Sequence, residues 1–444
     1  MRIRTLFAAA FALGASTTAL AAQAPNPAPP LDAAARRAIV DSAASLLTRY
    51  YAFADTGQML AAHLRARMAA GAFDGASTEP QLGEALTREM QAFNHDVHLY
   101  TVFRPGAGTQ AAGAFRMVQG GTRPQPSAAD VAALRRQNYG VARAERLDGN
   151  VGYLEITSFT RGDEAAAAID AAMAMLSHVD AMIIDLRRNG GGSEMTHYLM
   201  SWFQPDGAPQ SWNYTRMMGD TMKNVSRPVR GTKRLDIPLY VLTSGRTASA
   251  AEAFAFTMQQ AGRGKTVGAA TSGAGYNNMT FPLTGHTAIS ISIGHAFYPA
   301  TGKRWEGTGV LPDIAGPAEQ ALATARAEVL RTLAGREADP RRKQELAWAA
   351  EMAEAELRPV AVPAQALARY AGTYGTRVVT VDGGRLVYQR RADRPGDAVT
   401  PVSETVFAPS PDTRIEFVRD GSGAVTALRT RTAAGDVQTY PRTK

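Results

Sequence analysis

Ser249 lies where a predicted buried strand gives way to a helix. The apolar run 237–242 predicts the strand, a polar turn at 243–246 follows it, and an Ala-rich helix begins near Ser249. At a helix N-terminus the first backbone N–H groups are unpaired and the helix dipole is positive. Such donors stabilise the charge that develops on an attacked carbonyl oxygen, so this position suits a nucleophile. The structural alternative is an N-cap serine that only starts the helix.

A second loop between a strand and a helix, at residues 185–193, contains three consecutive glycines. Glycine lets the backbone adopt positive φ and approach a ligand closely, and a loop before a helix offers N–H donors. The lysine of a nucleotide-binding P-loop is missing. The loop fits an oxyanion hole better, with the Gly191 N–H complementing that of Ala250. A tight turn that requires glycine is the structural alternative.

A histidine and a carboxylate could complete a site that depends on this serine. A neutral imidazole beside a serine acts as its general base. His98 and His95 are equally eligible by composition, and the other histidines fall on predicted helices or beside a strand. Glu306 lies beside Trp305 in a glycine-flanked turn, where a partly buried carboxylate could orient the base. An exposed turn charge is the alternative for Glu306.

The elements that must hold these residues differ along the chain. Helical periodicity over 31–93 predicts a three-helix bundle, and strands alternate with helices from 139 to 314, which is typical of an α/β core. Past Pro363, short strands around Asp-Gly and Gly-Asp turns predict an antiparallel β domain. The predicted organisation is a signal peptide at 1–21, a flexible leader at 22–30, the bundle at 31–103, a linker at 104–138, the core at 139–316, a helical connector at 317–360 and the β domain at 361–444.

Composition and the N-terminus bound the location and the partners. Arg2 and Arg4, the apolar stretch 6–13 and small residues at 19–21 predict a secretion signal, too short to span a bilayer. The chain has no cysteine, which excludes disulfides and lipid attachment through an N-terminal cysteine. The net charge of +8 is spread without a Lys/Arg block. We expect a soluble periplasmic or secreted protein with no nucleic-acid partner and no membrane span.

Four ordered blocks resemble the S41 family of serine peptidases, which includes C-terminal processing proteases, the tricorn core and the interphotoreceptor retinoid-binding protein. Thr-Ala-Ser-Ala-x-Glu is the most specific of the blocks, which lie at 50–102, 185–192, 247–252 and 305–313. The resemblance implies an α/β core of the ClpP/crotonase type. It also implies Ser249 as nucleophile, the amides of Ala250 and Gly191 as oxyanion donors, and no metal or organic cofactor.

Departures from the family pattern separate its branches. The tail-specific branch uses a lysine base about two dozen residues after its serine, but residues 271–275 contain no lysine and Lys265 opens a predicted strand. The tricorn-like branch uses His, a second Ser and Glu. His98 and Glu306 match two of these positions, whereas Val97 replaces the bridging serine. The segment 104–138 is too short for a PDZ-type module.

The resemblance thus implies an exported peptidase that cleaves peptides or proteins, with His98 as base and Glu306 orienting it. A non-catalytic carrier of an apolar ligand is the main alternative, because the retinoid-binding branch uses the same scaffold and fold does not fix function. Retention of Ser249, His98 and Glu306 argues against a pure carrier. An esterase or amidase is a third possibility, but no G-x-S-x-G elbow surrounds Ser249.

Overall fold

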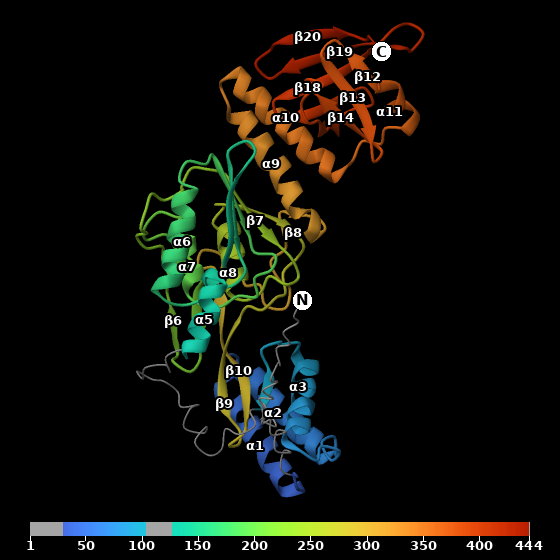
Figure 1. The fold of residues 1–444 in the computed structure, drawn as a ribbon. Coiled ribbons are helices and arrows are strands. Elements are labelled where there is room, and N and C mark those ends of the chain that lie inside the picture. Colours follow the sequence, from blue (N-terminus) through green and yellow to red (C-terminus); the bar gives the residue numbers. More distant parts are fainter. Residues whose placement is uncertain (1–29, 104–126, 444) are drawn as a thin grey trace, which may run out of the picture.

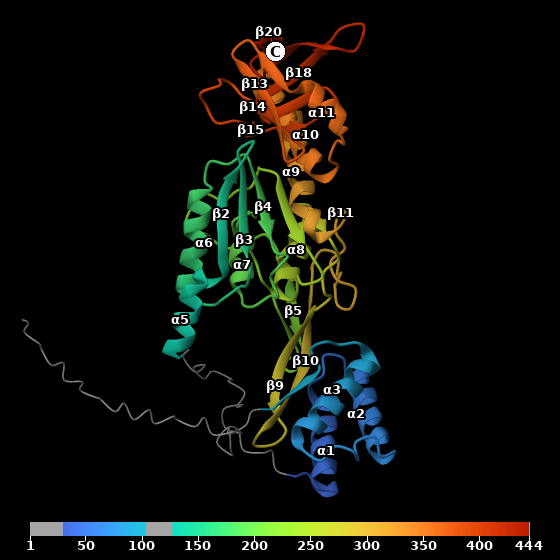
Figure 2. The ribbon, with the colours of Figure 1, turned by 45° about the vertical axis from the view of Figure 1, so that its right-hand side comes forward.

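The computed structural model describes residues 30–103 and 127–443. Its parts lie in a row, with the N-terminal helices at one end, the α/β core in the middle and the C-terminal sheets at the other end (Figures 1 and 2). The predicted signal peptide, nearly all of the leader and residues 104–126 of the predicted linker lie outside the described residues. Within the described part of the chain, no helix has the length and apolarity needed to cross a bilayer.

Three helices form the N-terminal bundle, as the periodicity predicts. Asp32 caps the first helix by accepting a hydrogen bond from the Ala35 N–H. The third helix ends at His95, which adopts the left-handed conformation at φ 59°. Buried leucines of all three helices pack with isoleucines of strand β10 in one apolar cluster. The helices are α1 Ala33–Tyr50, α2 Ala54–Ala69 and α3 Glu79–Asn94.

A six-stranded sheet forms the centre of the core, in the order β11-β8-β7-β4-β3-β2. All neighbours are parallel except β2 and β3. Successive side chains of a strand point to opposite faces, and both faces are covered, which explains the continuous apolar runs. The strands are β2 Val141–Leu147, β3 Val151–Ile156, β4 Ala181–Asp185, β7 Leu239–Thr243, β8 Lys265–Gly268 and β11 Ile314–Ala315.

Helices cover the two faces of this sheet, each with its own apolar cluster. Met182 and Ile184 of β4 pack with α6, α7 and α8, whereas Ala181 and Ile183 pack with α9 and α10. The helices are α6 Asp163–Met175, α7 Met195–Ser201, α8 Ala250–Gln260, α9 Ala321–Arg336 and α10 Pro340–Leu357. Helix α5, Ala128–Arg136, falls within the range predicted as a linker, and two short 3₁₀ turns lie at Asn138–Gly140 and Ala318–Gln320.

A second sheet joins the bundle to the core. Its long strand β10 pairs with β1 near its start and with β5 near its end, while β9 pairs with it along most of its length. The apolar and alternating patterns at 99–103 and 288–294 predict strands that cover β1 and part of β10, whereas no pattern predicts β5, β6 or β9. The strands are β1 Tyr100–Phe103, β5 Trp212–Thr215, β6 Asp220–Met222, β9 Tyr276–Pro282 and β10 Thr287–Phe297.

The C-terminal part consists of two antiparallel sheets around one apolar cluster. One of the predicted Asp-Gly turns, at Asp382-Gly383-Gly384, is confirmed as the hairpin turn between β13 and β14. The rings of Tyr370 and Phe417 stack with their centroids 4.1 Å apart. Helix α11, Ala364–Tyr370, is not predicted from the sequence. The strands are β12 Gly372–Tyr374, β13 Arg377–Asp382, β14 Arg385–Gln389, β15 Asp397–Ala398, β16 Thr400–Pro401, β17 Val406–Ser410, β18 Thr413–Arg419, β19 Val425–Thr432 and β20 Val437–Pro441. The predicted fold class is confirmed.

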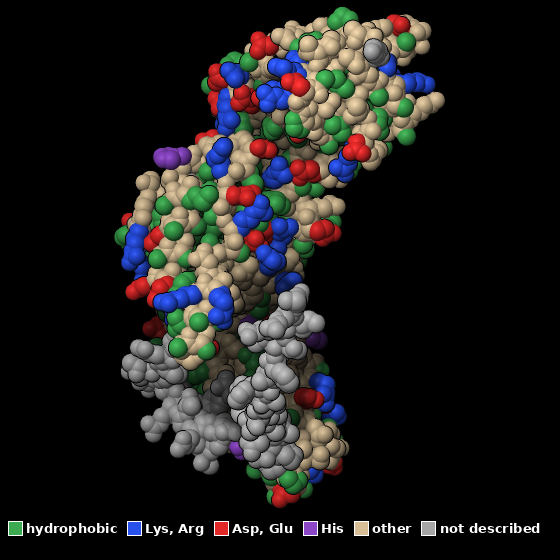
Figure 3. Space-filling model, viewed as in Figure 1, with side chains coloured by type: hydrophobic (Ala, Val, Ile, Leu, Met, Phe, Trp, Pro, Cys, Tyr) green, Lys and Arg blue, Asp and Glu red, His purple; other side chains and the backbone are tan. Residues whose placement is uncertain are grey.

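The surface charge is mixed on the face shown in Figure 3. Basic and acidic side chains are interspersed over the core and the C-terminal part rather than separated into fields of one sign. A nucleic-acid-binding face typically gathers its basic residues in a patch or stripe. The visible face therefore fits the solvated basic surface expected from composition.

Candidate active site

Ser249 occupies the N-cap of α8, directly after the turn that follows β7. Its φ of 52° and ψ of −118° lie in a region that residues other than glycine rarely adopt, which costs about 1–3 kcal/mol. Neighbouring hydrogen bonds hold this conformation. The Ser249 N–H donates to Glu252 Oε2 at 2.7 Å, and the Ala248 N–H donates to the Asn189 carbonyl at 3.1 Å. The serine is thus held at the positive end of a helix by contacts on both sides.

Glu252 connects the serine to the loop after β8. Its side chain is fully buried. Its two oxygens accept hydrogen bonds from Ser249 N–H, Thr271 O–H, Gly273 N–H and Ala274 N–H, at 2.5–2.8 Å. Hydrogen bonds to a carboxylate are stronger than those between neutral groups. The sequence contains Glu252 in its most specific block, but its positioning role is visible only in the structure.

The glycine loop after β4 contacts the serine because β4 and β7 are parallel neighbours whose carboxyl ends meet. Gly191 has φ 106°, and a Cβ added there would lie 2.8 Å from Ser249 Cβ and 3.1 Å from Ala250 N. Only glycine therefore fits. Ala250 is in the first turn of α8, where N–H groups have no acceptor within the helix.

The Gly191 N–H, however, is already paired. It donates to Asn189 Oδ1 at 2.8 Å, and the fully buried Asn189 also donates its side-chain N–H to the Ile156 carbonyl at 3.0 Å. Gly191 could serve an oxyanion only by sharing this N–H or by turning it away from Asn189. The donor roles of Ala250 and Gly191 stay predictions.

His98 lies in the short segment between α3 and β1, and its side chain is 12% exposed. Its Nδ1 is 3.4 Å from Oδ1 of Asp96, which is buried. Asp96 accepts hydrogen bonds from the Tyr51 hydroxyl at 3.1 Å and from the His98 backbone N–H at 2.9 Å. His95, equally eligible by composition, caps α3 and is exposed. The structure thus distinguishes the two histidines.

Glu306 meets this pair from the turn after β10. One possible ligand atom from each of Asp96, His98 and Glu306 lies within 4.8 Å of the other two. The Gly275 N–H donates to Glu306 Oε2 at 2.5 Å. Burial, reinforced by the negative charge of Asp96, raises the pKa of Glu306 to about 7, although His98 opposes the shift. The structure therefore brings the predicted His98 and Glu306 together and adds Asp96, which the sequence analysis did not single out.

Strand pairing explains why residues so distant in sequence meet. His98 leads into β1, and Tyr100 of β1 is opposite Ser290 of β10. The Ala52 N–H of the bundle also donates to the Ser292 carbonyl of β10. The chain leaves β10 at Phe297 and reaches Glu306 after one turn. The second sheet thus carries the histidine of the bundle to the carboxylate of the core.

Ser249 is linked to this cluster through one loop. Glu252 binds the Ala274 N–H, and the next N–H in the chain, that of Gly275, binds Glu306. Within residues 30–103 and 127–443, no hydrogen bond joins Ser249 Oγ to His98. Such bonds are often long in unliganded enzymes and tighten when substrate binds.

The shifted Glu306 predicts a pH dependence of stability. Its pKa of about 7 in the folded protein exceeds the ordinary value of 4.5, so between these values the folded state binds more protons than the unfolded state. Stability is therefore lost as pH rises from about 4.5 through 7. Glu306→Gln lacks this loss. As pH rises from 5 to 8, we expect its free energy of unfolding to increase by about 1–2 kcal/mol relative to that of wild type, after allowance for solvent screening.

The measurement is the thermal midpoint of both proteins at pH 5 and pH 8 in metal-free buffer. We expect the midpoint of Glu306→Gln minus that of wild type to be about 2–5 °C larger at pH 8 than at pH 5. Glu319→Gln, which changes an exposed carboxyl nearby in the chain, is the control and should leave the pH dependence unchanged. An identical pH dependence in wild type and Glu306→Gln would contradict the prediction.

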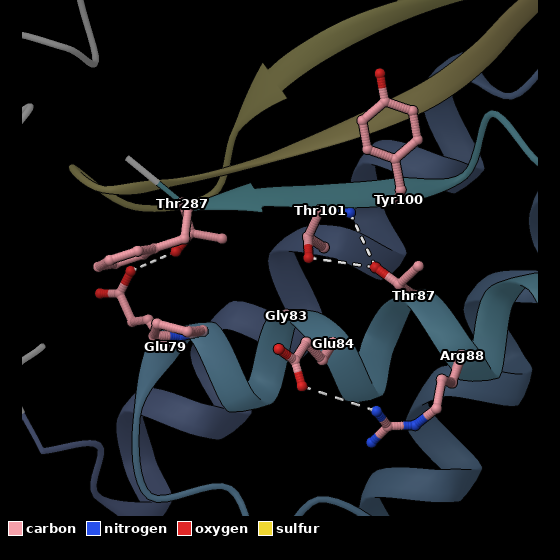
Figure 4. Close-up of a pocket in the computed structure, with 10 residues that line it drawn as sticks. Glu79, Gly83, Glu84, Thr87, Arg88, Tyr100, Thr101 and Thr287 are labelled. Carbon is pink, nitrogen blue, oxygen red and sulfur yellow. Dashed lines mark hydrogen bonds and ion pairs between the residues drawn. The ribbon is translucent and has the colours of Figure 1, made fainter. Parts of the chain in front are cut away.

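A separate pocket of about 440 Å³ lies between α3, β1 and the start of β10 (Figure 4). The Glu79 carboxylate points to Thr287 and accepts its hydroxyl at 2.6 Å, and the Thr101 N–H donates to the Thr87 hydroxyl. Polar and apolar residues line it together: Glu79, Pro80, Gly83, Glu84, Thr87, Arg88, Tyr100, Thr101, Phe103 and Thr287.

Two family models match the chain. "Peptidase family S41" matches residues 150–315, which contain Ser249, Gly191 and Glu306. "N-terminal domain of Peptidase_S41 in eukaryotic IRBP" matches residues 33–125, which contain His98 and Asp96. The chain belongs to peptidase family S41. The resemblance inferred from the sequence blocks is confirmed.

Among curated proteins, this S41 chain is 27% identical over 174 residues to the carboxy-terminal-processing protease of Bartonella bacilliformis. That match covers 38% of the chain and 39% of the relative, so the chain spans well under half the length of that protein.

Solved structures also resemble the S41 chain in part. A lipoprotein from Streptococcus agalactiae is 16% identical with a TM-score of 0.45, over 68% of this chain and 96% of that one. The photosystem II D1 C-terminal processing protease is 17% identical with a TM-score of 0.41, over 64% and 94%. Mature CPAF is 15% identical with a TM-score of 0.42, over 64% and 93%.

Proposed function

We propose that the chain is an exported serine peptidase in which Ser249 is the nucleophile and His98 the general base. The observation that carries this proposal is the meeting of His98 with Glu306 and Asp96 within 4.8 Å, one loop away from a serine at a helix N-terminus. A base held by carboxylates and a serine followed by the Ala250 N–H at a helix N-terminus are parts that acyl transfer requires.

The tautomer of His98 follows from its surroundings. A proton on Nδ1 is attracted by Asp96 Oδ1 at 3.4 Å, which leaves the lone pair on Nε2 for the serine proton. Glu306 is the second carboxylate beside the ring and stabilises the imidazolium when it forms. Since Val97 is half exposed and has no side-chain hydrogen-bonding group, it supplies no bridge between Glu306 and His98.

The reaction takes two steps. Ser249 Oγ attacks the peptide carbonyl carbon while His98 Nε2 takes the hydroxyl proton, and the carbonyl oxygen becomes an oxyanion. The Ala250 N–H donates to that oxyanion, and the Gly191 N–H joins it if it leaves Asn189. The C–N bond then breaks, and the leaving amine receives the proton from His98. Water, deprotonated by the same base, then attacks the acyl-serine ester. The bond to Ser249 Oγ breaks, and His98 returns the proton to that oxygen.

Peptides or proteins are the substrates we propose, and the periplasm or the medium is the location. The predicted signal at 1–21 supports export.

Covalent labelling of the purified protein with a serine-directed phosphonate tests the proposal. Intact mass should show one adduct on wild type and none on Ser249→Ala, with strongly slowed labelling of His98→Gln, because the thiol-free chain offers serine as the nucleophile and histidine as its base. Failure to label folded wild type would overturn the assignment of Ser249 and favour the carrier. Equal labelling of Ser249→Ala would place the nucleophile elsewhere.

A further inference from the structure

Asp96, His98 and Glu306 place one imidazole and two carboxylates together. This set of groups could hold a metal ion as well as form a catalytic base with its orienting carboxylates. We propose that the cluster binds a divalent cation of the zinc type, and that binding switches off the base. The proposal concerns the same residues as the proposed peptidase and rests on that function only for its inhibitory consequence.

The spacing of the donors matches a small tetrahedral ion. Zinc binds imidazole nitrogen and carboxylate oxygen at about 2.0–2.2 Å, so two ligand atoms on a tetrahedron lie about 3.3–3.5 Å apart. Asp96 Oδ1 and His98 Nδ1 are 3.4 Å apart. One ligand atom from each of the three residues lies within 4.8 Å of the other two, so a side-chain movement of about 1 Å would bring Glu306 to tetrahedral spacing and complete three of the four positions.

The nitrogen that would bind the ion is available. His98 Nδ1 is buried and makes no hydrogen bond within the described part of the chain. Both carboxylates are oriented by other donors, as ligands in metal sites are. Tyr51 O–H and the His98 N–H hold Asp96, and the Gly275 N–H holds Glu306. These contacts leave further carboxylate lone pairs free for a cation.

The donor set selects the class of ion. One imidazole and two carboxylates suit zinc and similar transition metals, whereas calcium prefers six to eight oxygen ligands and magnesium retains most of its water. Two carboxylates also balance the charge of a divalent ion. The fourth position would hold water, since the described cluster contains three ligand residues.

Binding at Nδ1 opposes catalysis through the tautomer of the ring. A neutral imidazole has one N–H and one lone pair. An ion on Nδ1 takes the lone pair there, so the proton resides on Nε2, and Nε2 can no longer accept the proton of Ser249. The cation and the activated serine therefore exclude each other, although Ser249 is not a ligand.

The test measures zinc binding without using activity. Ser249→Ala protein, freed of metal by a chelator, is titrated with ZnCl₂ by calorimetry and with CoCl₂ by visible absorption. We expect one ion per chain and the absorption of tetrahedral cobalt. Asp96→Asn and Glu306→Gln, each in the Ser249→Ala background, should bind at least tenfold more weakly. His178→Gln, which removes an exposed histidine, is the matched control and should bind as Ser249→Ala does.

A second arm tests the consequence. Zinc should slow phosphonate labelling of wild type, and a chelator should restore the rate. The metal site would be overturned if Asp96→Asn and Glu306→Gln bound zinc as tightly as the His178→Gln control. The mutual exclusion would be overturned if zinc bound but left the labelling rate unchanged. If wild type does not label at all, the peptidase proposal fails while the binding titrations still decide the metal site.

Discussion

His98→Gln is expected to lower kcat/KM by about 10⁴–10⁶-fold, because it removes the group that takes the serine proton. This loss corresponds to about 5–8 kcal/mol of transition-state stabilisation. Glutamine keeps the bulk and a hydrogen-bonding end beside Asp96, so the fold should be retained. Ser249→Ala should lose a similar factor, and the double variant should lose no more than either alone, since the two residues act as a unit.

The measurement uses a quenched fluorogenic peptide library on folded proteins of matched stability. His95→Gln is the control, because His95 was equally eligible in the sequence but is exposed at the end of α3. A loss as large in His95→Gln as in His98→Gln would contradict the assignment of the base. Asp96→Asn and Glu306→Gln, compared side by side, should each cost less, about 10²–10⁴-fold, and the larger loss identifies the main orienting carboxylate.

Glu252→Gln should destabilise the core by about 2–4 kcal/mol and slow the labelling of Ser249. Glu252 Oε2 accepts the N–H groups of Ser249 and Ala274, and Oε1 accepts Thr271 O–H and Gly273 N–H. Whichever way an amide is turned, its NH₂ group faces at least one backbone N–H, that of Gly273 on one side or those of Ser249 and Ala274 on the other. Buried donors are then left unpaired, and each costs about 1–3 kcal/mol.

Denaturant unfolding of wild type and variant, followed together with the phosphonate labelling rate, checks this prediction. Glu194→Gln makes the same chemical change at an exposed position and should alter stability by less than about 0.5 kcal/mol. Unchanged stability and labelling of Glu252→Gln would show that the loop after β8 is held by other contacts. A stable variant with slowed labelling would assign Glu252 to positioning the serine alone.

The local part of the site could be predicted from the sequence. The strand, turn and helix around Ser249 are encoded by contiguous residues, and so is the glycine loop. The choice between His98 and His95 could not be made from composition, because it depends on where α3 ends. The role of Asp96 required knowing which groups face the ring, and the pairing of Gly191 with Asn189 required the backbone conformation of the loop.

The second sheet explains most of what the sequence missed. β5 and β6 are only four and three residues long, and β9 contains two asparagines, so none has a strong strand pattern. β5 and β9 form because β10 offers long edges on both sides, and β6 then pairs with β5. Such pairing between distant segments has no local signal, and this sheet positions His98.

The pairing of β1 with β10 also divides the chemistry between two bodies. The proposed base and its buried aspartate belong to the helical bundle, whereas the proposed nucleophile, its predicted oxyanion donors and Glu306 belong to the core. Neither body holds the complete set. The two are joined by the four residue pairs of β1 and β10, by the Ala52–Ser292 hydrogen bond and by the apolar cluster between the bundle helices and β10. A newly made chain would be inactive until the bundle and the core make these contacts. Local unfolding there would abolish activity while the core stays folded.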